Sequence, residues 1–196
     1  VILAGIADIG ENRFQEAVAK YNELSRNTYD LRSIKWHMVG HLQTNKVKEA
    51  VKIFDLIQSV DSLHLASEID KQAVKINKVQ DILIEIKTST EATKFGLKFD
   101  EATGVIKEIV RLKNINIKGL MTIAPAVDNP EKARPYFRML RELRDEINQL
   151  SLPTSQAGAE SFQLKVLSMG MTDDFEVAIE EGSNMVRLGR AIFEDN

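Results

Sequence analysis

The chain has 196 residues, of which 43% are hydrophobic and 28% are charged, and its formal net charge is −3. This balance predicts one globular domain spanning residues 1–196, and the absence of a Lys/Arg run gives no reason to expect nucleic acid or an anionic membrane as a partner. There is no cysteine, which excludes disulfides and thiolate chemistry, and no apolar run of roughly 20 residues, so we expect a cytoplasmic protein.

Short β-like runs alternate with helical patterns along the chain. The expected strands are Ala7–Gly10, Lys35–Gly40, Leu56–Val60, Ile82–Lys87, Ile117–Thr122, Lys165–Met169 and Met185–Leu188. The expected helices are Arg13–Leu24, Thr44–Val51, Ser62–Ile76, Phe99–Leu112, Asn129–Leu150 and Thr172–Glu181. Such a β/α alternation with near-continuous apolar strands predicts an α/β fold, a (β/α)₈ TIM barrel with seven of its eight units visible.

The first residues bear on the missing unit. Val1–Gly5 reads as the end of a helix with glycine at its C-terminal cap. A helix at this point of a barrel follows a strand. We therefore expect the single barrel domain to be N-terminally incomplete here, with its first strand absent.

Two strand-to-helix turns near the C-terminus predict a phosphate site. Ser168 ends one strand, and Gly189 and Arg190 begin the helix after the last strand. Free backbone N–H groups at such turns bind anions, and barrels often hold phosphate after their last two strands. The alternative is a plain tight turn at Ser168, with Arg187 in a salt bridge at the barrel end.

Arg187 lies in the last strand, beside the expected phosphate site. It is placed to contact a heteroaromatic ring nitrogen. Because arginine stays protonated, such a contact keeps the ring nitrogen unprotonated. A pyridoxal ring held in this way is a poorer electron sink than one that faces a carboxylate.

Three further residues lie at expected strand ends, where barrel active sites form. Asn12 either faces this mouth or caps the following helix. His37 either contacts a ligand or is a hydrogen-bonded structural histidine. His37 and His41 are four residues apart in extended or loop conformation, so no metal site is expected. Lys87 is either a solvated lysine or, if desolvated, an amine able to form a Schiff base.

Several motifs occur in register along almost the whole chain. They are Gly10–Glu16, Trp36–Lys46, Ser59–Ser62, Gly119–Pro125, Leu167–Ile179 and Glu181–Phe193. Together they resemble the pyridoxal-phosphate homeostasis protein family, which is also described as proline-synthase co-transcribed or alanine-racemase-like.

The resemblance implies a fold-type III barrel of the alanine racemase N-terminal type. It implies binding of pyridoxal 5′-phosphate, a vitamin B6 cofactor, as a Schiff base, with no established catalytic turnover and no catalytic residue. Its members buffer the cofactor or pass it to pyridoxal-phosphate-dependent enzymes, and we expect a monomer. The contacts implied here are Asn12 and His37 near the ring, Ser168, Gly189 and Arg190 at the phosphate, and Arg187 at the pyridine nitrogen.

The chain departs from the family pattern in four places, one of which is Glu194, where Gly usually follows the position of Phe193. The Ser-Lys segment that carries the Schiff-base lysine is not found, so that lysine is expected on the missing first strand. Lys87 stands where many members have Asn, and Arg190 where many have Thr or Ser. Two alternatives stay open. One is a racemase or decarboxylase of this fold type, which would need a second β-rich domain. The other is a cofactor-free barrel enzyme acting on a phosphorylated metabolite.

Overall fold

The computed structural model describes residues 2–26, 33–89, 95–150, 152–153 and 162–193. Its strands are β1 (Asp8–Glu11), β2 (Lys35–Met38), β3 (Leu56–Val60), β4 (Gln80–Lys87), β5 (Leu97–Lys98), β6 (Ile115–Met121), β7 (Val166–Met171) and β8 (Met185–Arg187). Its α-helices are α1 (Phe14–Arg26), α2 (Val47–Ile53), α3 (Leu63–Val74), α4 (Phe99–Ile109), α5 (Arg134–Gln149), α6 (Phe175–Glu180) and α7 (Arg190–Phe193).

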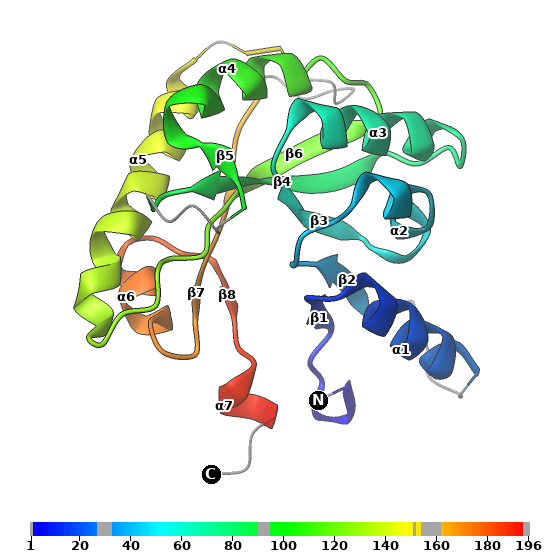
Figure 1. Ribbon diagram of the computed structural model, residues 1–196, viewed down its shortest axis with the longest axis horizontal. Helices are drawn as coiled ribbons and strands as arrows, with labels where there is room; N and C mark the ends of the chain where they lie inside the picture. Colours follow the sequence, from blue (N-terminus) through cyan, green and yellow to red (C-terminus); the bar gives the residue numbers. More distant parts are fainter. Residues whose placement is uncertain (1, 27–32, 90–94, 151, 154–161, 194–196) are drawn as a thin grey trace.

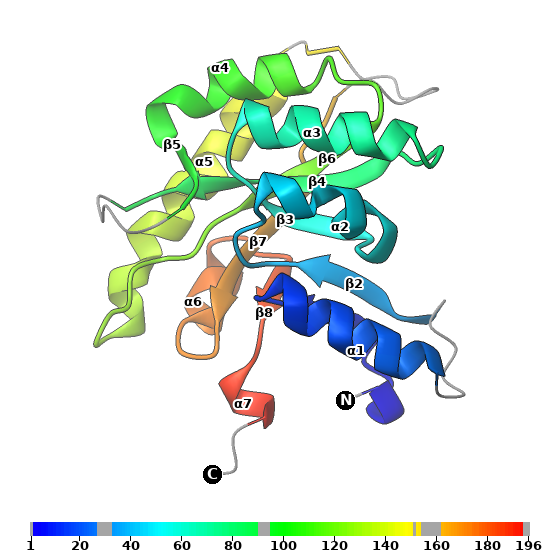
Figure 2. The same ribbon diagram turned by 45° about the vertical axis from the view of Figure 1, so that its right-hand side comes forward.

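The strands form one parallel sheet in the order β1-β2-β3-β4-β6-β7-β8, and the short β5 pairs with β4. The sheet curves through the middle of the molecule, and helices α1 to α6 lie on its outer side (Figures 1 and 2). Within the described residues β1 pairs with β2 and β8 pairs with β7. The other side of β1 and the other side of β8 are therefore unpaired in that part of the chain. The expected TIM barrel is therefore confirmed as a nearly closed parallel barrel.

Some boundaries differ from the expected ones, and local hydrogen bonds explain the differences. The segment expected as a helix from Asn129 begins with a 3-10 turn at Pro130–Ala133, capped by the Asn129 side chain, before α5 starts. The helix expected from Thr172 starts only at α6, because the Asp174 carboxylate accepts the Met171 N–H and holds the preceding turn. At the N-terminus a 3-10 turn is followed by Gly5 with φ of +84°, as expected of a helix cap; Val1 lies outside the described residues.

The strands separate two apolar cores. The larger core packs the outer face of the sheet against the helices and includes the fully buried Trp36, Phe54 and Phe137. A smaller cluster contains Leu56, Leu83 and Met121, with Ile123, Val166 and Met185 packed against it. Side chains alternate between the two faces of a strand. The smaller cluster thus marks the inner face of the barrel.

Candidate functional site

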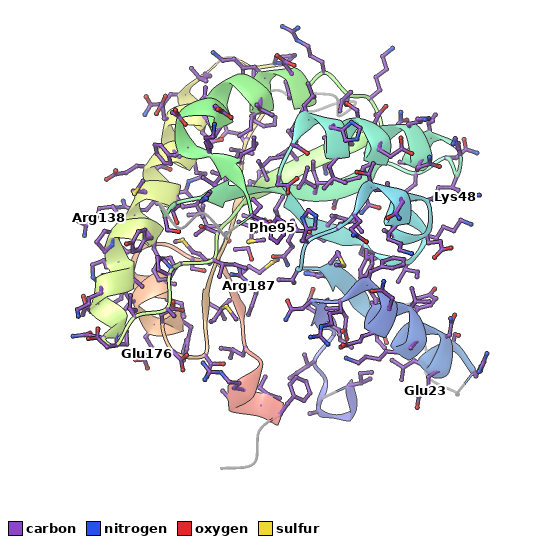
Figure 3. The ribbon with its side chains drawn as sticks, viewed as in Figure 1. Glu23, Lys48, Phe95, Arg138, Glu176 and Arg187 are labelled. Atoms are coloured by element: carbon purple, nitrogen blue, oxygen red, sulfur yellow. The ribbon has the colours of Figure 1, made fainter. Side chains whose placement is uncertain are left out.

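Four polar side chains lie on the inner face, next to the smaller apolar cluster. Gln58 on β3, Ser168 on β7 and Arg187 on β8 each follow an inner-cluster residue by two positions. His37 on β2 points the same way, because both its neighbours along the strand pack into the outer core. His37, Gln58 and Ser168 are buried, and Arg187 is partly exposed near the middle of the ring of strands (Figure 3).

These side chains form a continuous row of hydrogen bonds, the inner network, from β8 to β1. Arg187 Nη1 donates to Ser168 Oγ (2.7 Å), and Ser168 Oγ donates to Gln58 Oε1 (2.6 Å). Gln58 Nε2 donates to His37 Nδ1 (3.0 Å). His37 Nε2 lies 3.2 Å from Asp8 Oδ1, on the first strand. The inner network therefore connects the two edge strands of the sheet across the barrel.

The Arg187 guanidinium carries a positive charge, and one of its three nitrogen atoms has no hydrogen-bond partner in the described part of the chain. Its Nη2 donates to the carbonyl oxygen of Thr122 (2.8 Å), while its Nε is buried and has no partner in the described part of the chain. Burial lowers the pKa of Arg187 to about 10, although the charges of Glu85 and Asp174 raise it. The side chain therefore stays protonated at neutral pH. A buried donor without an acceptor is costly, so an acceptor brought to Nε would be favoured.

His37 is neutral in the folded protein at neutral pH. Burial lowers its pKa, and the nearby carboxylates of Asp8 and Asp55 offset this effect only in part. Because Nδ1 accepts from Gln58, the proton of the neutral ring lies on Nε2, where it is donated to Asp8.

The burial of His37 predicts that the stability of the fold depends on pH. An unfolded histidine binds its proton near pH 6.5, whereas folded His37, with its lowered pKa, binds it only at lower pH. The free energy of unfolding should therefore fall as pH drops below about 6.5, by about 1.4 kcal/mol for each unit of pKa lowering. Urea unfolding of the wild type and of His37→Gln between pH 7.5 and 5 measures this difference. His64→Gln, an exposed position on α3, is the control. Equal slopes in the wild type and His37→Gln would disprove the assignment.

The two C-terminal turns lie side by side, as expected. The Arg190 guanidinium pairs with the Asp173 carboxylate. The backbone N–H of Ala191 donates to Thr172 Oγ1 (3.5 Å), which joins the start of α7 to the β7–α6 turn. Helices α6 and α7 have only six and four residues, so their dipoles are small. Backbone N–H groups, rather than helix dipoles, are what these turns offer to an anion.

The six residues predicted for the site fall into two groups. Three belong to the inner network: His37, Ser168 and Arg187. Three are exposed and follow the ends of strands: Asn12, Gly189 and Arg190. Gly40 allows the Asn12 backbone to approach closely, because a Cβ at Gly40 would lie 1.9 Å from the Asn12 carbonyl oxygen. The Ser168 hydroxyl already has two partners, so its contact with an anion would replace or share one of them.

Sequence reasoning missed Gln58, Asp8 and Thr122. Gln58 is the central member of the inner network, with 1% of its surface exposed. A signal was present, because a glutamine in the middle of the expected buried strand Leu56–Val60 indicates a polar inner face. Its partners His37 and Ser168 lie 21 and 110 residues away along the chain, which no local pattern reveals.

His41 lies outside the inner network. Its ring stacks on Phe95 with centroids 4.0 Å apart, and its Nδ1 lies 3.5 Å from Asp61 Oδ2. Beside it is a shallow hollow whose lining includes Thr44 and Ser62. In the part of the chain that the structure describes, no group of three or more metal-ligating side chains comes together. Nor does any helix in that part have the length and apolar character to cross a membrane.

Comparison with known proteins gives a consistent result. The family described as "Alanine racemase, N-terminal domain" matches residues 1–196. The chain is 46% identical over 189 residues to the pyridoxal phosphate homeostasis protein of Aquifex aeolicus (96% of this chain, 77% of that one). It is 38% identical over 192 residues to the protein of the same name from Synechocystis (98% and 82%). The solved structure of PipY from Synechococcus elongatus with PLP bound superposes with a TM-score of 0.85 at 33% identity, covering 98% of this chain and 84% of PipY.

Proposed function

The chain belongs to the alanine racemase N-terminal domain family and, within it, is a relative of the pyridoxal phosphate homeostasis proteins, and from this membership we propose that it binds pyridoxal 5′-phosphate in cofactor homeostasis. The observation that carries the proposal is the unused Nε donor of Arg187, buried inside the barrel. The pyridine nitrogen of the cofactor is an acceptor of the kind that this donor lacks. The PLP-bound structure of PipY supports the same ligand.

The residues present fit the cofactor at three points. Arg187 would donate Nε–H to the ring nitrogen, with both Nη atoms already held by the protein. Ser168 and the backbone at Gly189 and Arg190 would hold the phosphate at the paired turns. Asn12 and His37 would lie near the ring, on the side of β1 and β2. When bound, the cofactor supplies an aldehyde that reacts reversibly with a primary amine.

The lysine that supplies this amine is proposed to lie on a strand between β8 and β1. Each of these two strands has one unpaired side in the described residues, and a single parallel strand would pair with both. Together with residues 1–196, such a strand would complete a barrel of eight units. Lys87 is on β4, the middle strand of the sheet order and far in that order from both edge strands, and is not proposed for this role.

We propose that binding is not followed by catalytic turnover. Arg187 stays protonated even with its lowered pKa, so it faces the ring nitrogen as a donor and keeps that nitrogen unprotonated. This weakens the ring as an electron sink. The homeostasis names of the relatives support the same reading. A monomer in the cytoplasm that passes the cofactor to other enzymes completes the proposal.

The test is cofactor affinity in an Arg187→Met variant. Losing a hydrogen bond from a charged donor costs about 1.5–3 kcal/mol, so we expect the dissociation constant for pyridoxal 5′-phosphate to rise roughly 10- to 100-fold. Fluorescence titration of the full-length protein measures it. Lys87→Met removes a positive charge from β4 at the mouth and is the control, with affinity close to that of the wild type. The proposal fails if Arg187→Met binds as tightly as the wild type, or if only Lys87→Met loses affinity.

A further inference from the structure

The Gln58 side chain joins the two halves of the inner network. Its carbonyl oxygen accepts from Ser168, which in turn accepts from Arg187. Its amide nitrogen donates to His37 Nδ1 and also lies 3.3 Å from Met185 Sδ. Gln58 is 1% exposed, so water does not compete for these contacts. One amide thus connects the arginine side of the barrel to the histidine side.

The direction of every hydrogen bond in the network follows from Arg187. A guanidinium can only donate, so Ser168 must accept from it and is left to donate its own proton to the Gln58 oxygen. The Gln58 amide then faces His37 with its N–H₂ group, which only an unprotonated Nδ1 can accept. The His37 proton is thereby placed on Nε2, next to the Asp8 carboxylate. A charge on β8 fixes a tautomer on β2.

The same contacts hold Arg187 in place. Ser168 and the Thr122 carbonyl oxygen each accept from one Nη atom, so that within the described residues Nε is the guanidinium nitrogen left without a partner. If Ser168 lost its acceptor, its proton would turn elsewhere and its lone pairs would no longer be directed at Nη1. The guanidinium could then rotate about its last bonds.

We propose that Gln58 is a positioning residue: through Ser168 it fixes the orientation of Arg187, and directly it fixes His37 as the Nε2–H tautomer. The orientation of Arg187 matters for cofactor binding, and that half of the inference rests on the proposed function. The tautomer of His37 does not depend on any ligand. The two halves can therefore be tested separately.

The first experiment uses ¹⁵N-histidine NMR on the full-length protein without cofactor at pH 7.5. The wild type should show His37 with Nδ1 unprotonated and Nε2 protonated. Gln58→Leu removes the donor to Nδ1 and should give a mixture of tautomers. Gln58→Glu keeps an acceptor for Ser168 but offers no N–H to Nδ1, so it should alter the tautomer signal as well.

A buried glutamine elsewhere provides the matched control. Gln80 on β4 is fully buried, and its amide donates to the backbone carbonyl oxygens of Phe54, Asp55 and Asp81 and to no side chain among the described residues. Gln80→Leu should destabilise the fold yet leave the His37 tautomer unchanged. An unchanged tautomer in Gln58→Leu, or the same change in Gln80→Leu, overturns the direct half of the proposal.

The second experiment is a double-mutant cycle on the affinity for pyridoxal 5′-phosphate. Gln58→Leu and Ser168→Ala should each weaken binding about tenfold, and the double variant should lose clearly less than the sum of the two losses in binding free energy, because the two residues share the path to Arg187. Gln58→Glu should bind more tightly than Gln58→Leu, since it keeps the Ser168 contact. With ¹⁵N-labelled cofactor, the ring nitrogen should be unprotonated in the wild type and shift toward the protonated form in Gln58→Leu.

Additive losses in the cycle, or an unchanged ring-nitrogen signal in Gln58→Leu, overturn the Arg187 half. A wild type that binds no cofactor overturns the proposed function and with it the Arg187 half. In that case the tautomer experiment still decides the direct half, so the two failures are distinguishable.

Discussion

Glu181→Ala is expected to lower the free energy of unfolding by about 3 kcal/mol. Glu181 follows α6, is 6% exposed, and accepts hydrogen bonds from three arginines of α5: Arg134 (3.3 Å), Arg138 (2.9 Å) and Arg141 (3.2 Å). Removing one partner of a buried ion pair leaves its charges uncompensated and costs about 3–5 kcal/mol. The lower end applies here because the arginines are partly exposed and can regain water.

Urea unfolding at pH 7 measures this loss. Glu181→Gln keeps the shape of the side chain and should lose roughly half as much, because hydrogen bonds to a charged group are about twice as strong as neutral ones. Glu176→Ala, at an exposed position on α6 (Figure 3), is the control and should stay within about 0.5 kcal/mol of the wild type. A Glu181→Ala variant as stable as this control would show that the contacts between the three arginines and the Glu181 carboxylate do not stabilise the fold.

Gly119→Ala is expected to lower the free energy of unfolding at least as much as Glu181→Ala does. Gly119 on β6 pairs with Val166 on β7, and a Cβ at Gly119 would lie 1.9 Å from the Val166 carbonyl oxygen. The clash is with backbone, so no side-chain rotation relieves it, and β7 must move away from β6. We expect a loss of about 3 kcal/mol, at the upper end for overpacking. Ser168 lies on the displaced strand, so cofactor affinity should fall as well.

Gly104→Ala is the matched control for this substitution. Gly104 is exposed on α4, and no heavy atom lies within 4 Å of the position that its Cβ would take. Alanine is a better helix former than glycine, so this variant should gain about 0.5–1 kcal/mol. Thermal or urea unfolding of both variants decides the matter, and equal stabilities would contradict the packing of β6 against β7.

The fold was predictable where apolar residues mark both ends of a buried strand. β3 has the predicted bounds, Leu56–Val60, although Gln58 and Ser59 are polar, and all five residues are buried. β5 was missed because two residues are too few to show any period. The start of α6 was placed too early because the Asp174 side chain, and not the local helix propensity, sets the preceding turn.

The site was predictable only in part. The two C-terminal turns follow from strand-to-helix patterns, and the structure joins them to each other. It brings Arg187 into contact with Ser168 and connects both to His37 through Gln58. The roles of Asn12, Gly189 and Arg190 at a cofactor stay predictions. The pairing of Gln58 with Ser168 and His37 was not predictable, since it depends on how β3 and β7 face each other across the barrel.

The most direct test of the account is the structure of the full-length protein crystallised with pyridoxal 5′-phosphate. We predict the pyridine nitrogen within hydrogen-bonding distance of Arg187 Nε and the phosphate at the paired β7–α6 and β8–α7 turns. A ring nitrogen directed away from Arg187, or a phosphate in the hollow beside His41, Thr44 and Ser62, would contradict the account.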